Sequence, residues 1–170
     1  MATTTVNYSS NTAITMDLAN LASSSTFVAG RECTEIDNTT NKYLDAMVRG
    51  SISVGTTPTA NTQIAVYVWG ANTSLATTAL DTLDGTDSAE TLTNTGVLSS
   101  FKRLATINVL ANTSDIAYPI LTCSVCAALG LLFLPKFWGL FAAHNTGVNL
   151  RNNAVNTNSL EFVGVKADTA

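Results

Sequence analysis

Two cysteines with the spacing of metal and redox motifs stand in the most apolar part of this sequence. Cys123 and Cys126 are separated by two residues, and the other candidate metal ligands are Cys33 and His144. A structural zinc site needs four ligands of this kind. The apolar surroundings and the absence of a preceding redox-type helix favour buried, unreactive thiols. Three cysteines do not form a disulfide framework, so we predict neither a zinc site nor a disulfide-stabilised fold.

Four carboxylates surround Gly85 in a pattern that first suggests calcium. Asp81, Asp84, Asp87 and Glu90 bring oxygen ligands to one stretch of chain, as calcium loops do. Their spacing does not match the EF-hand pattern. An exposed acidic loop is the simpler interpretation, although a loop region this long is often functional. We assign no metal ligand here and leave open whether the loop binds an ion.

The sequence offers no set of residues for catalysis. Its one histidine, His144, lies in an apolar segment just before a turn, where we expect a hydrogen-bonded structural role. There is no Gly-rich phosphate loop, no H-E-x-x-H motif and no nucleophile elbow. Carboxylate pairs cannot be judged from spacing because they meet only in the fold. We predict a protein that is not an enzyme, with no catalytic residue and no cofactor.

The composition indicates a low-charge β-domain. Of the 170 residues, 46% are hydrophobic and only 12% are charged. Most of the others are Thr, Asn and Ser, which favour strands and turns. The formal net charge of −4 and the scattered basic residues argue against nucleic acid as a partner. The N-terminus has no basic or apolar leader region, so we expect synthesis in the cytoplasm.

The segment 116–134 has two interpretations. It carries a single charge-free apolar run that approaches the roughly 20 residues a membrane-spanning helix needs. Pro119 and Gly130 interrupt the run. Such interruptions favour two buried strands, Ile120–Ala128 and Phe137–Ala143, in a protein without membrane contact. A membrane-anchored protein that spans at 116–134 is the alternative from another class.

Alternating apolar and polar residues predict further strands. From Leu44 to Val54 the even-numbered residues are apolar or small and the odd-numbered ones mostly polar, as in a half-buried strand. Residues 63–70 return as a second strand, which we expect to pair antiparallel with the first. Further strands are expected at 26–36, 101–110 and 159–166, with a long loop region over 71–100.

These strands predict one domain of an all-β class. About eight antiparallel strands with long loops fit a jelly-roll-like β-sandwich. The sandwich domain is expected over residues 26–170. Residues 1–25 are expected to form an N-terminal arm or an edge strand, since chain ends are often loose unless they are tied down. Whether such an arm exchanges between subunits is left open.

One late segment resembles a known protein family. The turn Leu134-Pro-Lys-Phe-Trp-Gly139 leads into an apolar strand and then into Asn145-Thr-Gly147. This segment resembles one in head decoration (cement) proteins of tailed bacteriophages, and the order of elements is similar over roughly residues 43 to 165. The apolar run Leu129–Leu134 departs from the family pattern. The resemblance implies a jelly-roll virion protein on the capsid exterior, made in the host cytoplasm. It implies that the protein binds the major capsid protein and stabilises the head by bridging coat subunits.

Contact residues are predicted from the strand faces and from this turn. If the aliphatic side of the strand at 63–70 is core, its Tyr and Trp residues point outward, and Trp, Tyr and Arg dominate contact energies. The predicted protein-contact residues are Met47, Arg49, Tyr67, Trp69, Lys136, Phe137 and Trp138. For Phe137 and Trp138, core packing is the competing interpretation. We expect a homo-oligomer, either a dimer or a trimer. A phage tail or fibre component that stacks host glycans on Tyr67 and Trp69 is the alternative function.

Overall fold

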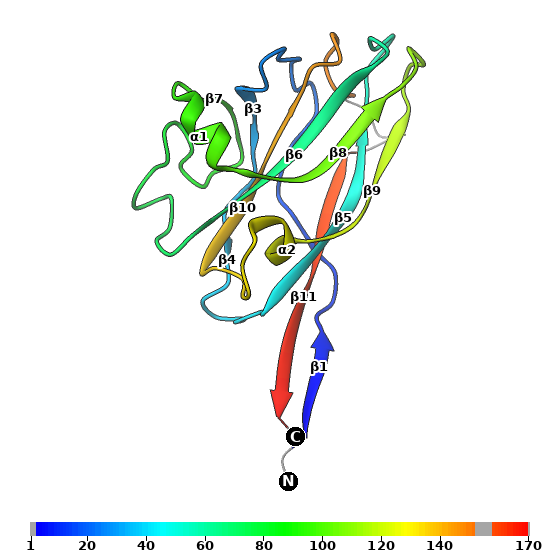
Figure 1. Cartoon of the computed structure of the whole chain (residues 1–170). Coiled ribbons are helices and arrows are strands. Elements are labelled where there is room, and N and C mark those ends of the chain that lie inside the picture. The colour runs from blue at the N-terminus through cyan, green and yellow to red at the C-terminus, as the bar shows by residue number, and fades with distance from the viewer. Residues whose placement is uncertain (1–2, 152–157, 170) are drawn as a thin grey trace.

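The chain folds into two antiparallel β-sheets that pack face to face. The computed structural model describes residues 3–151 and 158–169. In order across the first sheet lie β1 (Thr4–Tyr8), β11 (Ser159–Thr169), β5 (Asp45–Ser53) and β9 (Ala117–Ser124), with β2 (Thr12–Ala13) also beside β11. In order across the second sheet lie β7 (Ser88–Thr91), β3 (Ala29–Glu32), β10 (Phe137–His144), β6 (Thr62–Ala71) and β8 (Lys102–Val109), with β4 (Ile36–Asp37) also beside β10. Figure 1 shows that β1 and the end of β11 extend away from the body as a two-stranded ribbon.

The pairing order is that of a jelly roll. Apart from the short β2, β4 and β7, the strands pair from the chain ends inward: β1 with β11, β3 with β10, β5 with β9, and β6 with β8. A chain folded back on itself in this way and then wound into two sheets is the double-sheet jelly-roll arrangement. The predicted all-β, jelly-roll-like sandwich is therefore confirmed.

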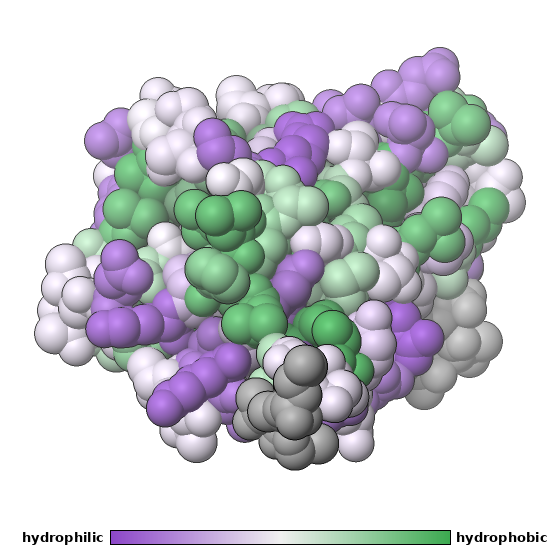
Figure 2. Space-filling view, turned by 60° about the horizontal axis from the view of Figure 1, so that its bottom comes forward, coloured by the Kyte–Doolittle hydropathy of each residue, from purple (hydrophilic) through white to green (hydrophobic). Residues whose placement is uncertain are grey.

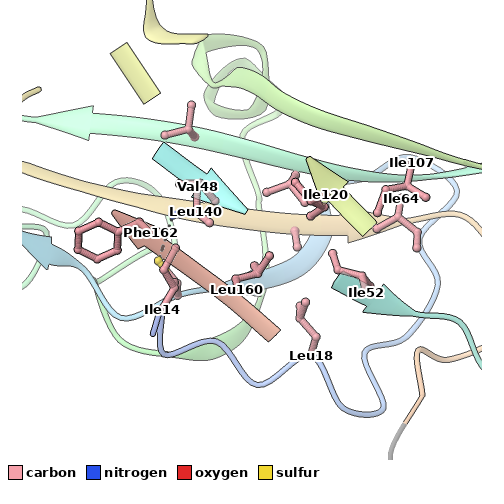
Figure 3. Close-up of a cluster of buried hydrophobic side chains, with 14 of the residues drawn as sticks. Ile14, Leu18, Val48, Ile52, Ile64, Ile107, Ile120, Leu140, Leu160 and Phe162 are labelled. Carbon is pink, nitrogen blue, oxygen red and sulfur yellow. Dashed lines mark hydrogen bonds between the residues drawn. The ribbon is translucent and has the colours of Figure 1, made fainter. Parts of the chain in front are cut away.

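The main core fills the space between the two sheets. Figure 3 shows apolar side chains from both sheets in one buried cluster, including Val48 and Ile52 of the first sheet and Leu140 of the second. Trp138 and Phe162 pack edge to face within this cluster, with ring centroids 5.2 Å apart. Burial of this continuous apolar layer is the main source of the sandwich's stability.

The N-terminal residues form an edge strand and also contribute to the main core. β1 pairs with β11 at the edge of the first sheet, which is one of the two structures expected for residues 1–25. Further along, Ile14, Leu18 and Leu21 are buried in the main core, and Figure 3 shows the first two beside the side chains of β11. The segment after β1 is therefore packed against the sandwich.

The alternating strand is confirmed, but its predicted partner is wrong. Ala46, Val48, Ile52 and Val54 are all fully buried, as their alternation indicates. β5, however, lies between β11 and β9, whereas β6 lies between β10 and β8 in the opposite sheet. The connection between β5 and β6 therefore leads from one sheet to the other. Both strands bury an apolar face in the same core, so the residue pattern alone fits either arrangement.

The segment 116–134 forms neither a spanning helix nor one long strand. It contains β9, the short helix α2 (Val125–Leu129) and a loop that leads to β10. The strand predicted at Ile120–Ala128 is wrong in its second half, because Ser124 ends β9 and caps α2. Its Oγ accepts a hydrogen bond from the Ala127 N–H at 2.9 Å. Within residues 3–151 and 158–169, no helix is long and apolar enough to cross a membrane.

A second core lies on the outer side of the second sheet. The long loop region after β6 folds back over this face, and its Leu75, Leu83 and Leu92 are buried with Tyr67 and Trp69. The loop region contains β7 and ends in the short helix α1 (Thr95–Ser100). The second sheet is therefore covered on both faces.

Candidate contact surfaces

Three of the predicted contact residues are buried. Tyr67 and Trp69 expose only 7% and 3% of their surface, and Trp138 is fully buried in the main core. The predicted outward aromatic patch is wrong because the long loop covers that face of β6. Trp69 also lies against Gly139, where an added Cβ would come within 2.5 Å of the indole ring. This close packing leaves no ring face on which a sugar could stack.

The other four predicted contact residues keep accessible side chains. Met47 is half-buried and Arg49 is exposed on the outer face of the first sheet. The Arg49 Nε donates to Glu161 Oε1 at 2.6 Å. Lys136 is exposed and Phe137 is half-buried where the chain enters β10. These four residues are divided between two sheets, and their role as contacts stays a prediction.

The acidic residues around Gly85 hold the long loop against the body. Glu32 is fully buried in β3 and accepts hydrogen bonds from the backbone N–H groups of Asp84 and Gly85, both at 3.1 Å. Asp87 pairs with Arg31 at 2.6 Å. Burial raises the pKa of Glu32 to about 7, because the charged carboxylate is removed from water, and the two N–H bonds only partly oppose this. Among the described residues, no group of three or more Asp, Glu, His or Cys side chains is arranged to hold a metal.

Two further carboxylates fix the loop in the same way. Glu35 accepts a hydrogen bond from the Ser74 hydroxyl at 2.5 Å and another from the Leu75 N–H at 2.8 Å. Asp81 accepts the Asn94 N–H at 2.9 Å, and this bond is the main reason why the pKa of Asp81 lies below its usual value. Glu32, Glu35 and Asp81 therefore all accept hydrogen bonds from the backbone of the long loop.

The cysteines and the histidine have structural surroundings. All three cysteines are free thiols, and Cys33 and Cys126 are buried. Burial raises the pKa of each of these two thiols to about 12. The ring nitrogens of His144 lie 2.9 Å from the Leu21 carbonyl oxygen and 3.0 Å from the Thr146 hydroxyl, and burial lowers the pKa of the ring. The prediction of unreactive buried thiols holds for Cys33 and Cys126, and the prediction of a hydrogen-bonded histidine holds for His144.

The most exposed run of large apolar side chains lies in one short loop. Leu131, Leu132 and Phe133 follow α2 and expose 47%, 89% and 64% of their surface. We call these three residues the apolar loop. Single exposed apolar residues are common on protein surfaces, but contiguous apolar surface marks a place where another molecule binds. The sequence shows that this run is unusually apolar, but its pattern does not indicate that it lies on the surface.

Backbone hydrogen bonds hold the apolar loop in place from both sides. Before it, Gly130 has a φ of +70°, and the N–H groups of Gly130 and Leu131 bond back to carbonyls of α2 at 3.3 Å and 3.0 Å. This pattern is a Schellman C-cap. After the loop, Leu134 is buried and donates its N–H to the Leu44 carbonyl at 2.8 Å. The loop is thus fixed with its side chains outward, so binding through it costs little ordering entropy.

The apolar loop adjoins the base of the β1–β11 ribbon. Leu44, whose carbonyl holds the loop, donates its own N–H to the Val165 carbonyl of β11 at 2.6 Å. Val165 is paired with Tyr8 of β1. Figure 2 views this end of the molecule and shows hydrophobic residues gathered near its middle, with hydrophilic ones around them. The end of the sandwich that carries the ribbon therefore has two neighbouring apolar features.

Comparison with known proteins identifies no relative of this chain. No family model, curated protein or solved structure matches the chain. Among the described residues, the apolar loop has the clearest features of a binding surface.

Proposed function

We propose that the protein is a non-enzymatic virion structural protein that binds the outside of a tailed-phage capsid. In this role it stabilises the head by bridging neighbouring coat subunits, and its partner is the major capsid protein. The observation that carries the proposal is the apolar loop, a rigid projection with three large apolar side chains and no charge. The resemblance of the following segment, Leu134–Gly147, to head decoration proteins supports the same partner.

The geometry suits attachment by a small end of the molecule. Leu132 exposes 89% of its surface in a fixed loop, so a shallow apolar pocket on a partner would remove most of that surface from water. One such contact is modest. A capsid presents the same site many times, and a protein that spans two sites gains from the high effective concentration of the second. Weak individual contacts are then sufficient for stable decoration.

The rest of the surface supports a packing role. Only 12% of the residues are charged, so dense arrays of the protein create little mutual repulsion. The carboxylates of Glu32, Glu35 and Asp81 accept hydrogen bonds from backbone N–H groups of the long loop. Much of the remaining polar surface consists of neutral hydroxyl and amide side chains, which hydrogen-bond to water. These properties are suited to a protein that stands beside many copies of itself.

Sedimentation with undecorated phage heads tests the proposal. We expect the wild-type protein to pellet with purified heads that lack their own decoration protein. Leu132→Asp places a charge at the tip of the apolar loop, and we expect it to weaken head binding at least tenfold, since about 2 kcal/mol of burial is lost and the charge must be desolvated.

The matched control changes another exposed leucine. Leu110 exposes 73% of its surface but follows β8, away from the apolar loop. We expect Leu110→Asp to pellet with heads as the wild type does. Wild-type protein that stays in the supernatant at all concentrations overturns the proposal. Equal binding by the wild type and Leu132→Asp leaves no role for the apolar loop and also overturns it.

A further inference from the structure

The ribbon formed by β1 and the end of β11 has one apolar and one polar face. Pairing in register places alternate residues of the two strands on a common side. The apolar face carries Val6, Tyr8, Val165 and Ala167, with Thr4 at its tip. The polar face carries Thr5, Asn7, Lys166 and Asp168. Val6 and Tyr8 expose 62% and 69% of their surface, so the apolar face has no cover within the described chain.

The outer edge of β1 is open and unprotected. The Ser9 N–H donates to the Gly164 carbonyl at 2.8 Å, so the backbone groups of Ser9 face β11. The backbone N–H and C=O groups of successive residues in an antiparallel strand point alternately toward and away from the neighbouring strand. The N–H and C=O groups of Thr4, Val6 and Tyr8 therefore point away from β11. Within the described part of the chain, β1 has no neighbour on that side. Natural edge strands are commonly blocked by Lys, Pro or a bulge, and Thr4–Tyr8 contains neither Lys nor Pro.

We propose that β1 pairs antiparallel with β1 of a second copy of this chain, about a twofold axis at Val6. Val6 then lies opposite Val6 of the partner subunit, and Thr4 lies opposite Tyr8 of the partner subunit. All three pairs in this register bring together backbone groups that point outward in the single chain. The two ribbons become one four-stranded sheet with a shared apolar face.

The charges of the ribbon favour this symmetric partner. Each of the two cross-strand rows on the polar face begins with Lys166 of one copy and ends with Asp168 of the other, because Lys166 is paired with Asn7 and Asp168 with Thr5. No like charges stand opposite one another, and β1 itself carries no charge. An isolated two-stranded ribbon is only marginally stable in water, and doubling it gives each β1 a hydrogen-bonded neighbour on both sides.

The shape of the molecule also permits this pairing. The ribbon extends away from the sandwich (Figure 1), and the pair Thr4 and Thr169 lies at its tip. Antiparallel pairing places the two bodies at opposite ends of the shared sheet, so they do not compete for the same space. The apolar loop of each copy lies outside the paired edge. Self-association through β1 uses the strand edge, whereas the capsid contact proposed above uses the apolar loop.

A proline in β1 tests the pairing with little effect on the single chain. The Val6 N–H points away from β11, so Val6→Pro removes an intermolecular donor and keeps the bonds between β1 and β11. We expect light scattering to give twice the chain mass of 17.8 kDa for the wild type, and the single-chain mass for Val6→Pro. The circular dichroism spectrum of the variant should match that of the wild type. A wild-type monomer at every concentration, or an oligomer that Val6→Pro leaves intact, overturns the proposal.

Cysteine cross-linking tests the register. Val6→Cys places two thiols opposite each other on the twofold axis, where hydrogen-bonded partners have Cα atoms about 5.5 Å apart, within disulfide range. Thr5→Cys is the control, since the two Thr5 positions are displaced along the strands. Both variants carry Cys123→Ser, because Cys123 is the half-buried thiol. Oxidation should give a covalent dimer for Val6→Cys only. No cross-link in Val6→Cys, or equal cross-linking in both, overturns the register.

Discussion

Two leucine-rich loops of this protein place their side chains in opposite environments. The long loop between β6 and β8 buries Leu75, Leu83 and Leu92 on the second sheet. The apolar loop after α2 leaves Leu132 and its neighbours in water. Both loops begin beside the same sandwich and both are fixed by hydrogen bonds. The difference therefore lies in the direction of the side chains, which point toward the second sheet in the long loop and toward solvent in the apolar loop.

The long loop is fastened by buried or half-buried acidic groups. Glu32 and Glu35 accept backbone N–H bonds from the loop, which pulls its leucines onto β6 and β10. In the apolar loop the fixed points are Gly130 and Leu134, and the residues between them face outward. The first arrangement stabilises the fold. The second maintains an apolar surface that contributes nothing to the single chain, which is the expected property of a contact site.

The largest expected effect compares the same substitution in the two loops. Leu83 is fully buried in the second core, so Leu83→Ala should lower the free energy of unfolding by about 2–4 kcal/mol through lost burial and a cavity. Leu132→Ala should change it by less than about 0.5 kcal/mol, because the side chain is already in water. Urea denaturation followed by tryptophan fluorescence measures both.

The comparison fails if the two variants lose similar stability. A large loss in Leu132→Ala would show that the apolar loop supports the fold of the single chain. A small loss in Leu83→Ala would show that the long loop is loosely attached. Leu110→Ala is the control for an exposed leucine elsewhere, and we expect it to behave as Leu132→Ala does.

Because the carboxyl group of Glu32 holds the long loop, we predict that the free energy of unfolding depends on pH. The pKa of Glu32 is about 7 in the folded chain against an ordinary value of 4.5, so the folded state keeps a proton that the unfolded state releases. The free energy of unfolding therefore falls as pH rises from about 4.5 to 7, and is constant above that range. We expect a loss of about 2–3 kcal/mol, since one pKa unit corresponds to about 1.4 kcal/mol. Urea denaturation at pH 5 and pH 8 measures it.

Glu32→Gln isolates this contribution. The amide has no charge at any of these pH values, so the variant should lack the loss between pH 5 and pH 8. His144 acts in the opposite direction, since its lowered pKa removes stability as pH falls below about 6.5, and it does so in both proteins. Glu161→Gln, which changes a half-buried acid on the outer face of the first sheet, should retain the wild-type loss. An identical pH profile in Glu32→Gln and the wild type would contradict the prediction.

The fold class was predictable because local pattern and composition determine it. Alternation from Leu44 to Val54, together with Thr-rich strands and Asn-rich turns, indicates a half-buried sheet protein. Strand partners were not predictable, since β5 and β6 bury their apolar faces in the same core from opposite sheets. Sequence alternation reports which side of a strand is buried and carries no information on the neighbouring strand.

The candidate contact surface was less predictable than the fold. Tyr67 and Trp69 alternate with aliphatic residues and so face away from the main core, but alternation could not show that a distant loop covers them. The apolar loop was hidden for the opposite reason. A run of large apolar residues predicts burial, and only the position of Gly130 and the exposure in the fold reveal an outward loop. The sequence also predicts an amide-rich loop over residues 149–158, of which 152–157 lie outside the described residues.

The smallest expected effect concerns two glycines, Gly85 in the long loop and Gly130 just before the apolar loop. Gly130 and Gly85 both have positive φ values, of +70° and +83°. An added Cβ at Gly130 meets no atom within 4 Å, so Gly130→Ala should cost only the backbone strain of about 1 kcal/mol. At Gly85 the Cβ would lie 3.1 Å from the Cβ of Glu35, so Gly85→Ala should cost more. Gly130→Asn should cost less than Gly130→Ala, because Asn tolerates the left-handed conformation. Thermal denaturation of the three variants measures this order. A cost at Gly130 equal to that at Gly85 would mean that the apolar loop is packed as tightly against the body as the long loop is, and the contrast between them would then be one of hydrophobicity alone.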